Sequence, residues 1–183
     1  MRKAYMGVMK IPSAVSCVAL LFAWTVTAAD APAPEASKVR TELDGMQGQP
    51  APALDLSNWI NGKAVQVSDL KGKIVVLDFW ATWCGPCIKS IPHNNDISKK
   101  YSDKGVVFIG VCAQKGAEKM AETVKTHQIE YPVAADTNGK TVAAYKANSF
   151  PDYYIIDRKG NLRWADFANK DVEKAITLLL AEK

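Results

Sequence analysis

The chain has 183 residues, 48% of them hydrophobic, which suits one medium-sized domain with additional segments. Its formal net charge is +4, but Arg2, Lys3 and Lys10 lie in the first ten residues, and the 20 basic side chains that follow face 19 acidic ones. No basic cluster is interleaved with aromatic residues, so we expect no nucleic-acid partner.

Residues 1–29 have the pattern of a secretory signal peptide. Basic residues precede an apolar run over residues 11–26, and small residues follow it at 27–29. We expect cleavage near residues 28–30 and export to the periplasm or cell envelope. A retained membrane anchor stays an alternative, although the run falls short of the roughly 20 clean apolar residues that a span needs. A lipid-modified Cys17 is less well supported, because Cys17 lies inside the run.

Residues 30–49 are rich in alanine, proline and charge, which predicts a flexible linker. We place the folded domain at residues 50–183. Asn61-Gly62, between two short strand-like runs, predicts an N-terminal hairpin. The near-continuous apolar run at residues 72–81 predicts a central strand that is buried on both faces.

The remaining sequence alternates predicted helices and strands. The predicted helices are residues 86–101 with a kink at Pro92, 116–128, 139–147, and 169–183 with Asn169 as N-cap. The predicted strands are residues 106–113, 131–136, and a closing hairpin of 152–157 and 162–167. This order predicts an α/β fold with a mixed β-sheet flanked by helices.

The most informative stretch is Cys84-Gly85-Pro86-Cys87, which follows Trp83 between a predicted strand and a predicted helix. The free N–H groups and the dipole of a helix N-terminus stabilise a thiolate, which lowers the pKa of Cys84. Cys87 lies one turn further along the same helix face. We expect Cys84 to be the exposed, attacking thiol and Cys87 the more sheltered thiol that resolves a mixed disulfide. Pro86 fits the first turn of a helix.

Two other interpretations of this motif remain open. A zinc site needs four ligands, and Cys112, His93 and His127 do not have the paired spacing. A purely structural disulfide would close a very small loop and stabilise the fold little. We favour a redox centre, and we expect no metal and no cofactor.

The stretch VVLDFWATWCGPC, residues 75–87, resembles the active site of the thioredoxin superfamily. Over residues 50–183 the pattern resembles the TlpA/ResA branch of exported thiol-disulfide oxidoreductases, with an N-terminal hairpin and an inserted helix and strand. The resemblance implies a thioredoxin fold and reduction of disulfides in substrate proteins, because Gly-Pro is typical of reducing members. Such a reductase needs a thiol electron donor in the membrane or envelope. We expect a monomer.

The resemblance also implies roles for residues outside the motif. Asp78 would accept a proton from Cys87, although the lysine that often pairs with this aspartate is missing from residues 106–113. Pro151 would have a cis peptide bond that exposes the Phe150 backbone to substrate. Trp83, Gly85, Pro86 and Phe150 are therefore the predicted substrate-binding residues.

The chain departs from the family pattern at three places. Ser90 stands where the branch has a glutamate, Asp152 replaces a threonine, and Phe150 is bulky for its position. We expect Phe150 and Asp152 to lie where the substrate docks and to alter substrate choice. Cys112 is predicted to be a small buried hydrophobic residue, with a third redox thiol as the alternative.

Two other functions use the same residue types. A thiol peroxidase of the related peroxiredoxin (AhpC/TSA) branch would need threonine and arginine support beside Cys84, which is not evident in the sequence. A metal carrier could bind its ion with the two cysteines, but it would want a nearby histidine. Insulin reduction, peroxide consumption and metal titration distinguish these functions.

Overall fold

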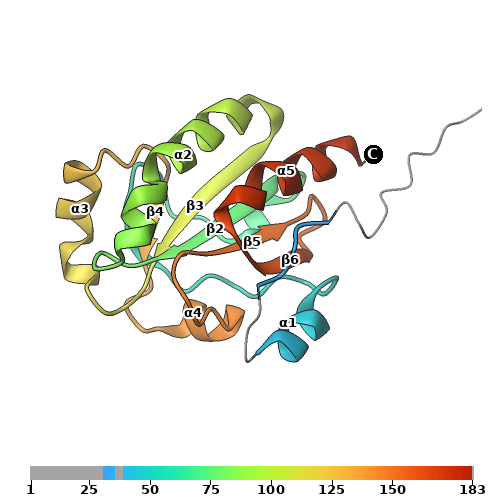
Figure 1. The fold of residues 1–183 in the computed structure, drawn as a ribbon, viewed down its shortest axis with the longest axis horizontal. Helices are drawn as coiled ribbons and strands as arrows, with labels where there is room; N and C mark the ends of the chain where they lie inside the picture. Colours follow the sequence, from blue (N-terminus) through green and yellow to red (C-terminus); the bar gives the residue numbers. More distant parts are fainter. Residues whose placement is uncertain (1–30, 36–38, 183) are drawn as a thin grey trace, which may run out of the picture.

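The structure is a computed structural model that describes residues 31–35 and 39–182. A six-stranded sheet with the order β1-β4-β3-β2-β5-β6 forms its centre (Figure 1). The strands are β1 (Ser57–Ile60), β2 (Ile74–Trp80), β3 (Val106–Cys112), β4 (Val133–Ala135), β5 (Asp152–Ile156) and β6 (Leu162–Phe167). Strand β2 pairs parallel to β3 and antiparallel to β5, so the predicted mixed sheet is confirmed.

Helices cover both faces of this sheet. They are α1 (Arg40–Met46), α2 (Gly85–Tyr101), α3 (Met120–Thr126), α4 (Lys140–Tyr145) and α5 (Val172–Ala181), with short 3-10 helices η2 (Val67–Leu70), η3 (Ser102–Lys104), η4 (Ala117–Lys119) and η5 (Asn169–Asp171). Helices α2, α3 and α5 pack on one face, and α1 and α4 contribute to the other (Figure 1). None of the helices in the described residues has both the length and the apolar character needed to span a bilayer.

Strand β2 is buried along its whole length, as its apolar sequence predicts. Successive side chains of a strand point to opposite faces. Ile74, Val76 and Trp80 therefore pack toward α2, whereas Leu77 and Phe79 pack toward α4. Asp78 follows the first set, which places its carboxylate on the α2 face.

The predicted hairpin around Asn61-Gly62 is wrong. The run before it forms β1, but β1 pairs antiparallel with β4, and the residues after it form no strand up to η2. The Asn61 side chain donates hydrogen bonds to the backbone oxygens of Ile129 and Tyr131, which directs the turn toward β4. A turn signal specifies a reversal of the chain, but not which strand becomes the partner.

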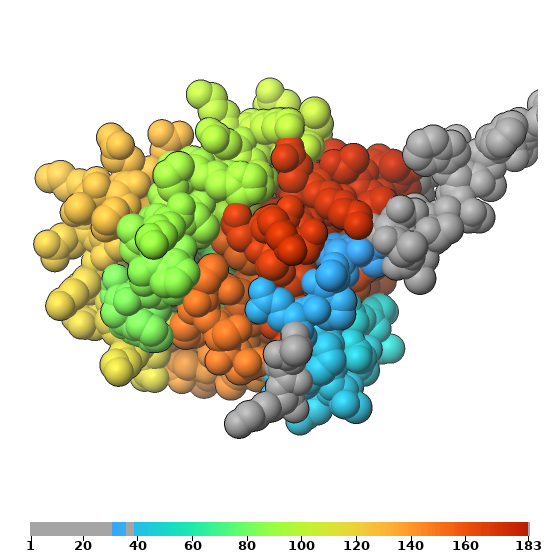
Figure 2. All heavy atoms as spheres, viewed as in Figure 1, coloured from blue at the N-terminus to red at the C-terminus, as the bar shows by residue number. Residues whose placement is uncertain are grey.

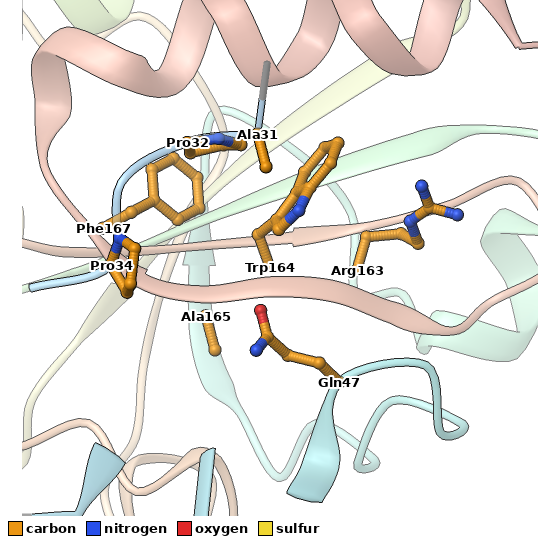
Figure 3. A pocket seen from close by; sticks show the side chains of 8 residues that line it. All are labelled: Ala31, Pro32, Pro34, Gln47, Arg163, Trp164, Ala165 and Phe167. Carbon is orange, nitrogen blue, oxygen red and sulfur yellow. The ribbon is translucent and has the colours of Figure 1, made fainter. Parts of the chain in front are cut away.

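The predicted linker also differs from the structure. Pro34 forms an antiparallel bridge with Phe167, and the Glu35 backbone N–H donates to the Asp166 backbone carbonyl oxygen at 2.8 Å. These contacts cover the outer edge of β6, where unpaired backbone groups would otherwise be exposed. The segment lies against the C-terminal part of the molecule in Figure 2, and Figure 3 shows Pro32 and Pro34 beside Phe167.

Helix α1 continues this packing within the predicted linker. Leu43 is fully buried, with 0% exposure, in the core layer below the sheet. Arg40 donates a hydrogen bond to the Ala165 backbone at 3.1 Å. Residues 39–49 are therefore part of the folded unit, because one buried leucine and edge hydrogen bonds outweigh a composition typical of linkers. The predicted signal peptide lies outside the described residues.

Candidate active site

Cys84 and Cys87 form a disulfide at the junction of β2 and α2. Cys84 is the N-cap of α2, and its sulfur accepts the Cys87 N–H at 3.1 Å. The helix start therefore directs its partial positive charge at the Cys84 sulfur. The cysteines are 4% and 2% exposed, so the difference in exposure that we expected is small in this disulfide form. Gly85 and Pro86, between them, are exposed.

Pro151 precedes β5, and its peptide bond with Phe150 is cis, as the resemblance implies. The Phe150 ring lies 6.0 Å from the ring of Trp83 at an angle of 69°. Trp83 is 57% exposed and directly precedes Cys84. The structure thus places an aromatic pair next to the disulfide.

Asp152 does not lie where substrate would dock, so this expectation is wrong. It is 2% exposed and faces the layer of α1 and α4, where the Tyr154 hydroxyl donates to its Oδ2 at 3.2 Å. Burial, together with the nearby carboxylates of Asp166 and Glu35, raises the pKa of Asp152 to about 8. Strand alternation accounts for the position, because Asp152 pairs in register with Phe79.

Asp78 is 2% exposed on the α2 face of the sheet. Its Oδ2 accepts hydrogen bonds from Asn94 Nδ2 at 3.0 Å and from the Tyr131 hydroxyl at 3.2 Å. Its Oδ1 is buried and has no hydrogen-bond partner among the described residues. Burial raises the pKa of Asp78, and these donors lower it by stabilising the ionised form. The effect of burial is larger, so the resulting pKa is about 7. A group with this pKa can exchange a proton near neutral pH.

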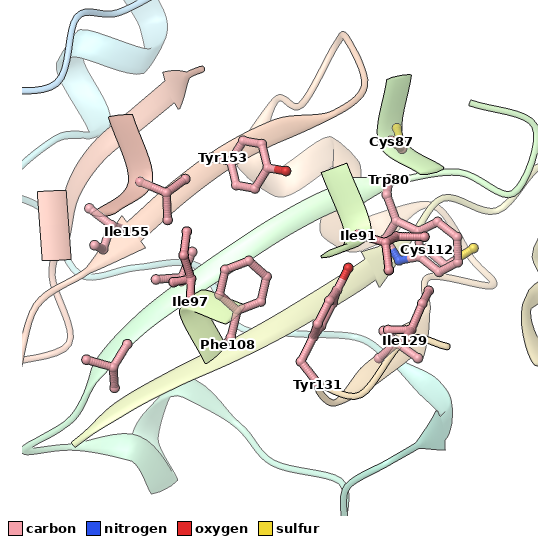
Figure 4. Close-up of a cluster of buried hydrophobic side chains, with 14 of the residues drawn as sticks. Trp80, Cys87, Ile91, Ile97, Phe108, Cys112, Ile129, Tyr131, Tyr153 and Ile155 are labelled. Atoms are coloured by element: carbon pink, nitrogen blue, oxygen red, sulfur yellow. The ribbon is translucent and has the colours of Figure 1, made fainter. Parts of the chain in front are cut away.

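The missing lysine has a structural counterpart. Gly110 pairs with Asp78 across β2 and β3. A Cβ at Gly110 would lie 3.0 Å from the Tyr131 ring, 3.1 Å from Trp80 Nε1 and 2.7 Å from Val133. The absent side chain therefore leaves room for Tyr131, which precedes β4 and is drawn in Figure 4. Its neutral hydroxyl reaches the Asp78 carboxylate on the same face of the sheet.

A buried polar network extends from Asp78, and the sequence analysis did not find it. Asn94 also donates to the Tyr153 hydroxyl at 3.1 Å, and that hydroxyl lies 3.3 Å from Ser90 Oγ. Ser90 in turn donates to the Cys87 carbonyl oxygen at 2.8 Å. The predicted cap Asn169 instead donates to Tyr153 at 2.7 Å, and no side chain caps α5.

One signal for this network was present in the sequence. Ile91, Asn94, Ile97 and Tyr101 follow the spacing of one helix face, and all four are buried. A polar residue in such a series must find a buried partner. The pattern gives no information on which strands supply that partner.

Cys112 and Trp80 lie side by side in register on β3 and β2. Cys112 is a free, buried thiol, and burial raises its pKa to about 12. The prediction of a small buried residue at this position is confirmed. Within the described residues, no group of three His, Cys, Asp or Glu side chains is arranged to hold a metal ion.

Comparison with known proteins identifies the family. The AhpC/TSA family model matches residues 47–165. The chain belongs to the AhpC/TSA family. It is a TlpA/ResA-type protein of the thioredoxin superfamily, as the following relatives show.

The thiol-disulfide oxidoreductase ResA of Bacillus cereus is 36% identical over 115 residues, which cover 63% of this chain and 66% of ResA, just under two thirds of its length. The thioredoxin-like protein YneN of Bacillus subtilis is 32% identical over 144 residues, covering 76% of this chain and 84% of YneN.

Among solved structures, a candidate thiol:disulfide interchange protein DsbE from Chlorobium tepidum superimposes with a TM-score of 0.66 and 31% identity. The match covers 74% of this chain and 98% of that one. The predicted thioredoxin fold is therefore confirmed, apart from the partner of β1.

Proposed function

We propose that this chain is an exported thiol-disulfide oxidoreductase that reduces disulfides in substrate proteins. The observation that supports it best is the Cys84–Cys87 disulfide at the start of α2, together with the ionisable carboxyl group of Asp78, which is buried on β2 and hydrogen-bonded to Asn94 of the same helix. The relatives named ResA are described as thiol-disulfide oxidoreductases. Export rests on the signal-like sequence of residues 1–29.

The proposed reaction begins with both cysteines reduced. The Cys84 thiolate, stabilised by the start of α2, attacks a substrate disulfide, forms a mixed disulfide and releases one substrate thiolate. Cys87 then attacks the Cys84 sulfur, which releases the second substrate thiolate and restores the Cys84–Cys87 disulfide. Two electrons pass from the protein to the substrate, and the two released thiolates take up protons from Asp78 or solvent.

Asp78 serves in this scheme as the proton acceptor for Cys87. Its unpartnered Oδ1 is the oxygen that is available to take the proton, because Oδ2 already accepts two hydrogen bonds. The backbone of Phe150, before the cis bond, pairs with an extended substrate segment, and Trp83 with Gly85 and Pro86 forms the rest of the contact surface. A thiol carrier of the membrane or envelope returns electrons to the disulfide, and the protein works as a monomer.

The peroxidase alternative gains no support from the arginine positions. Arg40 pairs with Asp44, Arg158 donates to the Leu179 carbonyl, and Arg163 pairs with Glu182. None of the arginines in the described part of the chain contacts the disulfide. We therefore propose no peroxidase function.

Trapping with Cys87→Ser tests the proposed roles. Cys84 should stay covalently bound to its substrate, because the resolving thiol is missing, and nonreducing electrophoresis with mass spectrometry should identify mixed disulfides. Cys84→Ser is the matched control and should trap nothing. Equal trapping by both variants, or none by Cys87→Ser, would contradict the assignment.

A further inference from the structure

A groove lies beside the residues that precede Cys84. Thr82, Trp83, Lys115, Gly116, Glu118 and Lys119 line it, and its volume is about 250 Å3. Thr82 and Trp83 directly precede Cys84, and the other four residues belong to the segment between β3 and α3. Any protein whose disulfide is attacked by Cys84 passes close to this groove.

The groove has defined walls. Thr82 Oγ1 donates to the Gly116 carbonyl at 2.9 Å, and Trp83 Nε1 donates to the Lys115 carbonyl at 2.9 Å. Gly116 has a φ of +89°, and a Cβ there would lie 2.4 Å from Thr82 Oγ1. The segment therefore packs closely against Thr82 and Trp83, which precede Cys84, and this packing keeps its charged residues near the disulfide.

The charge of the groove is mainly positive. Lys115 and Lys119 line it together with Glu118, and the exposed Lys89 follows Cys87 by two residues. Within the described residues, none of these three lysines has an acidic side chain within ion-pair distance, whereas Lys100, Lys140 and Lys146 each pair with a carboxylate. Positive charge therefore exceeds negative charge next to the disulfide, because the groove is lined by Lys115 and Lys119 against Glu118.

Trp83 lies between the groove and Phe150, whose backbone is the proposed docking site for an extended substrate segment. Its exposed ring lies 6.0 Å from the Phe150 ring on one side, and the Lys115 ammonium lies 5.8 Å from its centroid. A substrate chain paired with the Phe150 backbone would cross this ring. Because an extended chain advances about 3.3 Å per residue, side chains within a few residues of the substrate cysteine can reach Lys115 and Lys119.

From these contacts we propose that the groove binds acidic side chains of the substrate protein, so that disulfides flanked by aspartate or glutamate are reduced preferentially. The inference rests on the proposed reductase function and names its substrate class. Complementary charge at the rim of an interface mainly accelerates productive encounter and is weakened by salt. The preference should therefore affect kcat/KM more than the maximal rate.

Single-turnover reduction of matched disulfide peptides tests the proposal. Three peptides of equal length carry Glu, Gln or Lys beside each cysteine, and the pre-reduced protein is mixed with each at low ionic strength. We expect the Glu peptide to react about fivefold faster than the Lys peptide, the size that two exposed ion pairs supply. The difference should shrink to less than about twofold in about 0.5 M salt.

Charge reversal locates the effect. The variant Lys115→Glu/Lys119→Glu should prefer the Lys peptide, whereas the control Lys71→Glu/Lys174→Glu, with the same net charge and two exposed remote positions, should keep the original preference. If both variants change the preference equally, overall charge is responsible and the proposed site is wrong. Equal rates for all three peptides with the wild-type protein would also overturn it.

A neutral small disulfide separates this inference from the proposed function. The control Lys71→Glu/Lys174→Glu should reduce bis(2-hydroxyethyl) disulfide at the wild-type rate, and for Lys115→Glu/Lys119→Glu the rate with this uncharged disulfide is the reference by which its peptide rates are divided. If the wild-type protein reduces it but shows no charge preference, the reductase function stands and the groove proposal fails. If the wild-type protein reduces neither it nor any peptide, both proposals fail.

Discussion

The two carboxylate oxygens of Asp78 have different surroundings. Oδ2 accepts hydrogen bonds from Asn94 and Tyr131, and Oδ1 has no partner in the described residues. Neutral donors stabilise an ionised carboxylate less than a nearby cation does. The effect of burial therefore outweighs that of these donors, and the pKa of Asp78 is raised to about 7.

Removing one of these donors should change the pH dependence of the reaction. In Tyr131→Phe the ionised form of Asp78 loses a hydrogen bond, so its pKa should rise further. We expect the pH midpoint of disulfide reduction to move up by about one pH unit, in line with the strength of a hydrogen bond to a charged group. Stopped-flow rates between about pH 5 and 9 measure this midpoint.

Tyr145→Phe is the matched control for this prediction. Tyr145 is also buried, but its hydroxyl donates to the Pro52 carbonyl on the opposite face of the sheet. This variant should leave the midpoint unchanged, and Asp78→Asn should abolish the transition. A midpoint that moves equally in both tyrosine variants would show that Tyr131 does not act through Asp78.

At this scale the sequence predicts the residues that belong to a local motif. Cys84 and Cys87 are defined by their spacing, and Asp78 is conspicuous as a charge within an apolar strand. Asn94 and Tyr153 come from elements far apart in the chain and are common residue types. Their hydrogen bond depends on how α2 lies over β5, which no local pattern encodes.

Helix α1 shows how composition can mislead at the scale of elements. Alanine, proline and charge around residues 30–49 are typical of linkers, yet the segment covers the edge of β6. The decisive features are the buried side chains of Pro32 and Leu43 and backbone hydrogen bonds, which most residue types can make. Likewise, the turn at Asn61 was predictable, but the pairing of β1 with β4 was not.

The packing of α1 should contribute measurably to stability. Leu43→Ala should lower the free energy of unfolding by about 2–4 kcal/mol, because it removes a fully buried side chain and leaves a cavity. Urea denaturation measures the change. Thr41→Ala, at an exposed position of the same helix, should change stability by less than about 0.5 kcal/mol. A flexible linker would instead give similar small effects for both variants.

At the scale of the whole molecule, two buried carboxyl groups lie on opposite faces of the sheet. Asp78 faces α2, whereas Asp152 lies near Asp166, Glu35 and Tyr154 below the sheet. The pKa values are raised to about 7 and about 8. A raised carboxyl pKa means that the folded state binds protons more tightly, so its contribution to stability is present at acidic pH and is lost as pH rises through the folded-state pKa.

The protein should therefore lose stability between about pH 4, near the pKa of an unfolded aspartate, and about pH 8, near the raised folded-state values. Asp152→Asn should remove part of this loss: it should be more stable than the wild-type protein at about pH 9, by up to several kcal/mol, and similar at about pH 4, where the aspartate is protonated in the folded state and largely protonated in the unfolded state. Thermal unfolding across this range measures the effect. Asp96→Asn, at an exposed site on α2, should follow the wild-type curve. A constant difference between Asp152→Asn and the wild-type protein at all pH values would contradict the prediction.

The burial of Cys112 has a consequence for fidelity. Cys84, Cys87 and Cys112 can form three different disulfides, and only Cys84–Cys87 is the redox centre proposed above. With its thiol inside the sheet and its pKa raised to about 12, Cys112 is a poor nucleophile and cannot reach a mixed disulfide unless β3 opens. The folded sheet thus protects against scrambling: the three cysteines of the described residues act as one pair and one inert thiol.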